Sequence, residues 1–154
     1  MKEPYGKVLN SNIAVFRKLG FSKSVDDEYL VVFSKENCLV EISAERYYLP
    51  SITTKLIDQK GKKYSIRIIR EILDKNNLEK DTKELEEIRR KYRLDDKNID
   101  NDLRKKGIEE YINLSFKQLV GFLSGNLDTL IVIDDLFKAE YLKREDELMG
   151  HLRI

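Results

Sequence analysis

Two adjacent carboxylates, Asp134 and Asp135, follow a short apolar run in the stretch TLIVIDDLFKAEYLKRED (129–146). If the run is a β-strand, an acid pair at its end could hold a metal ion or act as an acid/base pair. On a helix the same acids would belong to a solvated face. The chemistry open to them therefore depends on the element that carries them.

The periodicity of this stretch favours a helix over about 127–148. The apolar residues of its inner face would be Leu130, Ile133, Phe137 and Tyr141. Glu140 stands four residues before Arg144, the favourable order of acid and base on a helix surface. A strand here would also need a partner, and no other strand-like run lies nearby in the sequence. We therefore interpret the acid pair as a surface feature and expect no metal site.

Other residues suited to chemistry are few. Asp58-Gln59-Lys60 resembles the end of a nuclease-type acid-x-Lys motif, but it sits at a glycine-bearing turn. One cysteine, Cys38, lies in an apolar run, and one histidine, His151, lies near the C-terminus. This inventory excludes a zinc site of the usual ligand types and disfavours a nucleophile paired with histidine. Glycine-rich phosphate-binding motifs are absent, so we expect no cofactor and no catalytic activity.

The composition indicates one water-soluble domain. The chain has 154 residues, of which 41% are hydrophobic and 37% are charged. Its 29 basic and 28 acidic residues nearly cancel, which argues against a general binder of polyanions. We expect no membrane span, because no apolar run approaches the roughly 20 residues that one needs. The start, MKEPYGKVLN, lacks the apolar core of a secretory signal, so a cytoplasmic location is expected.

The first half of the chain predicts an α+β arrangement. An N-terminal helix should end before Gly20, a natural left-handed cap. Alternating apolar residues in 29–34 and 38–43 predict a hairpin, and 52–57 predicts a third strand. The run 64–73 returns to helical spacing. We therefore expect a helix, a three-stranded antiparallel meander and a second helix.

The second half is expected to be all-helical, because strand-like alternation is absent from it. Residues 74–81 look like a linker, and capping-box spacings predict helix starts at Asp81 and Ser115, with Gly125 ending the latter helix. The expected organisation is a single domain, 1–154, made of an α/β-sheet part (1–74), a charged helical arm (75–110) and C-terminal helices (111–154).

A basic segment in the expected arm is one candidate binding surface. Its residues are Arg89, Arg90, Lys91, Tyr92 and Arg93. Cations beside an aromatic ring could hold phosphates and stack a base. However, Glu84, Glu86 and Glu87 stand one turn upstream and can pair with these cations. Nucleic-acid binding is therefore the alternative and not the preferred interpretation.

An acidic strip near the C-terminus is the other candidate. Its residues are Asp134, Asp135, Glu140, Glu145, Asp146 and Glu147. Such a strip could steer a basic protein partner. Tyr47, Tyr48 and Tyr141 are candidate aromatic anchors, since tyrosine is enriched at binding hot spots. For Tyr141 the apolar helix face favours a place in the core instead.

Residues 30–73 contain a V-x-F-S strand, a V-x-I strand, the pair Glu45-Arg46 and a Tyr-Ser-Ile helix start at 64–66. In these features the segment resembles small bacterial immunity proteins, which are encoded beside polymorphic or contact-dependent toxins. The resemblance implies a non-enzymatic protein that binds one cognate toxin domain and blocks it. Many such toxins attack nucleic acids, and a basic nuclease domain would be complemented by acids. The alternative is a nucleic-acid-associated regulator of mobile-element origin.

Overall fold

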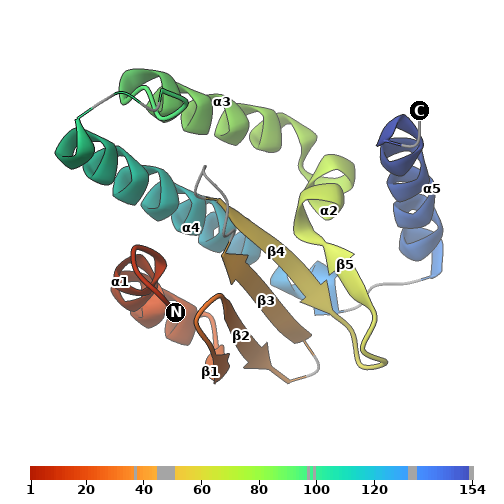
Figure 1. The fold of residues 1–154 in the computed structure, drawn as a ribbon. Helices are drawn as coiled ribbons and strands as arrows, with labels where there is room; N and C mark the ends of the chain where they lie inside the picture. Colours follow the sequence, from red (N-terminus) through yellow and green to blue (C-terminus); the bar gives the residue numbers. More distant parts are fainter. Residues whose placement is uncertain (37, 45–50, 97, 99, 132–134, 153–154) are drawn as a thin grey trace.

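The computed structural model describes all residues except 37, 45–50, 97, 99, 132–134 and 153–154. Over the described residues, an N-terminal helix precedes an antiparallel sheet, and further helices follow it (Figure 1). The elements are α1 (Tyr5–Lys18), β1 (Ser22–Asp26), β2 (Leu30–Lys35), β3 (Cys38–Ala44), β4 (Ile52–Ile57), β5 (Lys63–Ser65), α2 (Ile66–Leu73), α3 (Lys75–Lys91), α4 (Asn101–Ile131) and α5 (Asp135–Leu152).

The sheet is a meander in the order β1-β2-β3-β4-β5, with every neighbouring pair antiparallel. Phe33 lies opposite Val40, which in turn lies opposite Leu56, so these three side chains share one face. All three are buried. Helices α1 and α4 lie across this face of the sheet (Figure 1). The core therefore sits between the sheet and these two helices.

The cap of α1 forms as the sequence predicts. Leu19 ends the helix, and Gly20 takes a left-handed φ of 93° that a side chain would disfavour. Phe21 then packs edge-on against Phe16, with ring centroids 6.4 Å apart. Phe16 also stacks on Phe33 at 4.1 Å. The cap thus anchors α1 to the sheet.

The α+β class is confirmed, but the described sheet has five strands and not three. The expected hairpin and third strand are present as β2, β3 and β4, and Cys38 at the start of β3 is buried. The sequence pattern missed β1 because all five of its side chains are exposed, so it shows no apolar alternation. It missed β5 because that strand is only three residues long.

Two long helices replace the breaks expected in the second half. α3 begins at Lys75, so the predicted linker at 74–81 is wrong. α4 runs for 31 residues through Ser115 and Gly125, so neither position bounds a helix. Burial of Ile112 and Phe116 against the core outweighs these local signals. No described helix is long and apolar enough to cross a membrane.

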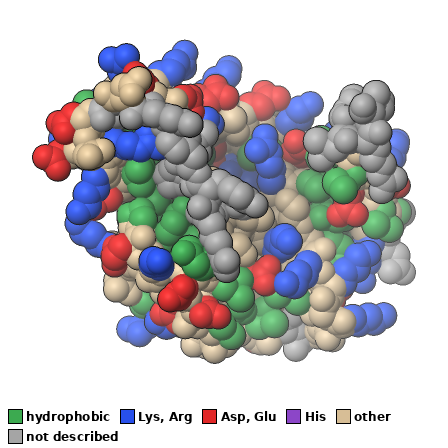
Figure 2. Space-filling view, in the orientation of Figure 1, with side chains coloured by type: hydrophobic (Ala, Val, Ile, Leu, Met, Phe, Trp, Pro, Cys, Tyr) green, Lys and Arg blue, Asp and Glu red, His purple; other side chains and the backbone are tan. Residues whose placement is uncertain are grey.

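The helix expected over 127–148 corresponds to the end of α4 and most of α5, and 132–134 lies outside the described residues. α3 packs against both α2 and α4. No side chain of α3 is buried, and Figure 2 shows charges of both signs mixed over it. The boundaries of the predicted arm stay a prediction.

Candidate binding surfaces

Tyr141 fixes α5 to the rest of the molecule. Its side chain is 1% exposed and packs edge-on against Tyr64, with ring centroids 5.0 Å apart. Its hydroxyl accepts a 2.7 Å hydrogen bond from the backbone N–H of Ser65. Burial, together with the charge of nearby Glu145, raises the pKa of Tyr141 to about 12. Tyr141 is therefore a core residue and not an exposed anchor.

The side of α5 next to Tyr141 carries what we call the α5 outer face: Leu142, Glu145, Asp146 and Met149. These positions follow one another at i, i+3, i+4 and i+7, so they share one side of the helix. Leu142 is 43% exposed and Met149 is 46% exposed. Asp146 is exposed and forms no ion pair among the described residues. The face thus combines exposed apolar side chains with carboxylates.

Glu140 is a further acid of α5 without a charge partner among the described residues, because Arg144 contacts other acids. It bonds to Glu147 at 3.2 Å and approaches Glu71 at 3.8 Å, so the pair with Glu140 expected from spacing does not form. Glu140 is exposed on the side of α5 that faces away from the α5 outer face, and it has no ion pair within the described chain. Lys138 and Lys143 are the other cations of the helix, which makes its acidity modest.

Of the other predicted partner-binding residues, Tyr47, Tyr48 and Asp134 lie outside the described residues, and Asp135 is the first residue of α5.

The basic segment has fewer groups available for binding nucleic acid than its sequence indicates. Tyr92 is 5% exposed, and it donates a hydrogen bond to Glu110 of α4. Its ring is therefore not available to stack on a base. Arg89 pairs with Asp95 at 2.8 Å, and Arg93 pairs with Asp96 at 2.9 Å. The partners are acids that follow the segment, and not the glutamates expected from upstream. Arg90 and Lys91 are exposed.

Asp58 has a structural role in the turn between β4 and β5. Its carboxylate accepts N–H bonds from Lys60 and Lys62, each at 2.9 Å. The Tyr64 hydroxyl donates to it at 3.3 Å. These hydrogen bonds of the turn account for the Asp58-Gln59-Lys60 sequence, which resembles the end of a nuclease motif. Within the described part of the chain, no three His, Cys, Asp or Glu side chains are grouped to hold a metal ion.

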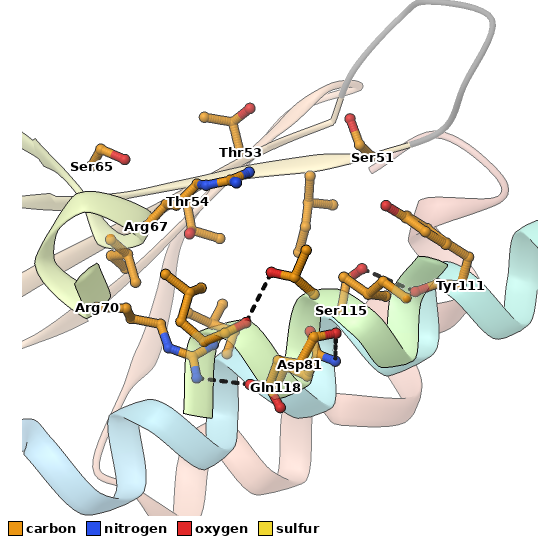
Figure 3. Close-up of a pocket in the computed structure, with 16 residues that line it drawn as sticks. Ser51, Thr53, Thr54, Ser65, Arg67, Arg70, Asp81, Tyr111, Ser115 and Gln118 are labelled. Atoms are coloured by element: carbon orange, nitrogen blue, oxygen red, sulfur yellow. Dashed lines mark hydrogen bonds and ion pairs between the residues drawn. The ribbon is translucent and has the colours of Figure 1, made fainter. Parts of the chain in front are cut away.

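The sequence did not predict a cleft of about 380 Å³ between β4, α2, α3 and α4 (Figure 3). Its apolar lining is Ile52, Ile66, Leu78, Leu85 and Leu119. Its polar lining is Ser51, Thr53, Thr54, Ser65, Arg67, Arg70, Asp81, Thr82, Tyr111, Ser115 and Gln118. These residues come from five elements, β4, β5, α2, α3 and α4, and from Ser51 just before β4, so no local motif could have revealed the cleft.

One wall of the cleft is held by an ion-pair network. Arg70 bonds to Asp81 of α3 at 2.7 Å and to Asp74 at 3.1 Å. Gln118 of α4 donates to the backbone carbonyl of Asp81 at 3.0 Å. Three helices are thereby tied together. Arg67 is exposed and has no hydrogen-bond or ion-pair partner among the described residues.

Comparison with protein-family models, with curated proteins and with solved structures finds no match to this chain. The assignment of a function therefore depends on the surfaces described above. What they offer is binding: exposed apolar groups, carboxylates without ion pairs, and a polar cleft with one unpaired guanidinium.

Proposed function

We propose that this protein is a non-enzymatic immunity protein that neutralises a cognate bacterial toxin by binding its toxic domain. The observation that carries the proposal is the α5 outer face, which pairs the exposed side chains of Leu142 and Met149 with the carboxylates of Glu145 and Asp146. Apolar anchors beside charges are the composition expected of a protein–protein contact. The resemblance of residues 30–73 to immunity proteins supports the same function.

The construction of α5 suits a docking element. The helix has 18 residues and is about 27 Å long at the usual rise. One side is committed to the core through Tyr141, and the α5 outer face next to it stays on the surface. Covering an exposed apolar side chain there with a partner removes its surface from water, which lowers the free energy of the complex. Acids at its rim would favour a basic partner and speed the encounter.

The alternative, a nucleic-acid-associated regulator, is less well supported. It requires an exposed ring among free cations, whereas Tyr92 is buried and two of the arginines are paired. The remaining cations, Arg90 and Lys91, make too small a phosphate-binding surface to carry a function.

Co-expression with the product of the adjacent upstream gene tests the proposal. If the neighbour is the toxin, it should arrest growth alone, and this protein should restore growth and co-elute with it as a complex. A neighbour that arrests growth without being bound or neutralised would contradict the proposal. So would a neighbour that neither binds nor harms the cell.

A further inference from the structure

The sheet ends differently on its two sides. At one side, β1 has an exposed edge, but a bulge between Lys23 and Val25 disrupts it. Its Lys23 and Asp26 side chains pair at 2.8 Å beside it. Bulges and charged side chains are common protections of an edge strand against pairing with another chain. This edge is therefore poorly suited to accept a further strand.

At the other side, β5 covers only part of β4. It pairs with Lys55, Leu56 and Ile57 and then turns into α2. Tyr141 satisfies the outer N–H of Ser65, which closes the edge of β5. Residues Ile52 to Thr54 pair with β3 on one side, and no described strand pairs with them on the other.

The hydrogen-bond pattern shows which backbone groups this leaves open. The N–H of Asp58 donates to the carbonyl of Lys62, so Asp58 directs its backbone groups toward β5. In an antiparallel ladder this direction alternates from residue to residue. Leu56, Thr54 and Ile52 therefore point the same way as Asp58, whereas Thr53 points toward β3. The last β4–β5 pair, Lys55 with Ser65, brings the N–H of Ile66 to the carbonyl of Thr54. Among the described residues, the groups left open on that side are therefore the N–H of Thr54 and both backbone groups of Ile52.

These open groups face the cleft of Figure 3, which both residues line. The cleft is bounded below by α3 and α4, so a segment placed there would be enclosed rather than exposed. In Figure 3 the Arg67 side chain extends alongside β4 toward the cleft. Two arginines and one aspartate, Asp81, line the cleft, which gives it a net charge of +1. Because Arg70 is committed to Asp81, Arg67 is the cation left for a ligand.

We propose that the open edge of β4 at Ile52–Thr54 accepts an extended acidic peptide segment of another protein as an added strand. The backbone of the segment would bond to Ile52 and Thr54, and one of its carboxylates would pair with Arg67. The cleft has room for about three residues, which span about 10 Å as a strand. Main-chain bonds give such binding its affinity, and side-chain pockets give it specificity. The inference does not depend on the proposed toxin partner or on the α5 outer face.

Selection from a phage-displayed library of random 12-residue peptides on the full-length protein tests this inference. We expect selected peptides to contain Asp or Glu, and synthetic copies to protect the Thr54 amide from hydrogen exchange at least tenfold. Arg67→Glu should weaken their binding at least tenfold. Lys117→Glu, which removes an exposed cation of α4 outside the cleft, is the matched control and should leave binding unchanged.

A scan of N-methylated peptides distinguishes strand addition from other modes without altering the protein. Within the short stretch of the peptide that pairs with β4, methylation should abolish binding at alternate positions and leave it intact at the position between them, because only alternate N–H groups of an added strand face β4. Loss of binding without this alternation would overturn the inference. So would selected peptides that leave the Thr54 amide unprotected, that bind Arg67→Glu equally well, or that protect β1 instead. Failure to select any peptide that meets these criteria would overturn it as well.

Discussion

Arg67 and Arg70 stand one turn apart on α2, and the structure gives their guanidinium groups different surroundings. Arg70 is 7% exposed, bonds to Asp74 and Asp81, and lies 5.3 Å from the ring centroid of Phe122. Arg67 is exposed and unpaired within the described chain. At this scale the same residue type serves stability at one position and is available for binding at the other.

We expect Arg70→Leu to lower the free energy of unfolding by about 3 kcal/mol, because it leaves two carboxylates without their cation. The loss should lie at the low end for a buried pair, since water reaches Asp74 and Asp81 in part. Arg67→Leu is the matched control on the same helix and should change stability by no more than about 0.5 kcal/mol. Urea denaturation of both variants measures the difference. Equal losses would contradict the network described here.

The Tyr141 hydroxyl should make stability depend on alkaline pH. Burial holds its pKa near 12 in the folded protein, above the value of 10 for an exposed tyrosine. Its contribution is therefore complete below pH 10 and is lost as pH rises toward 12. At pH 8, Tyr141→Phe should cost about 1–3 kcal/mol, since the N–H of Ser65 loses its acceptor.

Unfolding measured at several pH values checks this dependence. The stability difference between the wild-type protein and Tyr141→Phe should shrink between pH 10 and 12, by about 1.4 kcal/mol per pH unit at most. A difference that stays constant over this range would show that Tyr141 is not the titrating group.

At the scale of elements, the segment after α3 is pressed against α4. A Cβ at Gly107 of α4 would lie 2.5 Å from Cβ and Cγ of Tyr92, and 3.0 Å from Leu94. Both neighbours are buried, so they have little room to move. The packing of Tyr92 and Leu94 on α4 therefore leaves room only for glycine at position 107.

Gly107→Ala should therefore destabilise the protein by about 1–3 kcal/mol through overpacking. Gly121→Ala, in the same helix with nothing within 4 Å of the added methyl group, should stabilise it by about 1 kcal/mol. Thermal denaturation of both variants provides the comparison. A neutral Gly107→Ala would mean that this segment does not pack on α4 as described.

The longer strands with a buried face could be predicted from the sequence, whereas the fully exposed strand β1 could not. Alternating apolar residues predict β2 through Val31 and Phe33, and β3 through Val40 and Ile42. The alternation exists because these four side chains are buried. The strand β1 buries no side chain and is held by backbone pairing, which leaves no pattern to detect. In α4, the spacing at Ser115 resembles a helix start, but the Ser115 hydroxyl instead donates to the carbonyl of Tyr111 within the helix.

The two candidate binding surfaces differ in the same respect: the acids of α5 could be predicted from the sequence, and the cleft could not. The acids and apolar residues of α5 lie close together in the sequence, so their helical spacing could be followed there. The cleft depends on β5 ending before β4 does, and on α3 and α4 lying opposite the open edge. Both are properties of the tertiary structure, and a local pattern carries no information about them.

At the scale of the whole molecule, one face of the sheet is covered by α1 and α4, and α5 is attached at the far side by α2 and Tyr141 (Figure 1). The α5 outer face and the cleft lie on different elements and can be altered independently. Variants of one surface therefore serve as folding controls for the other. We predict that the proposed toxin partner binds through the α5 outer face.

The most direct test is the dissociation constant of the purified toxin domain for the wild-type protein and for the variant Asp146→Lys. Asp146 is exposed and has no ion pair in the described chain, so the fold should survive the change. Glu87→Lys makes the same charge change at an exposed position of α3 and is the matched control. The account predicts at least a tenfold weaker complex for the α5 variant and an unchanged one for the control. Equal affinities for all three proteins would contradict it.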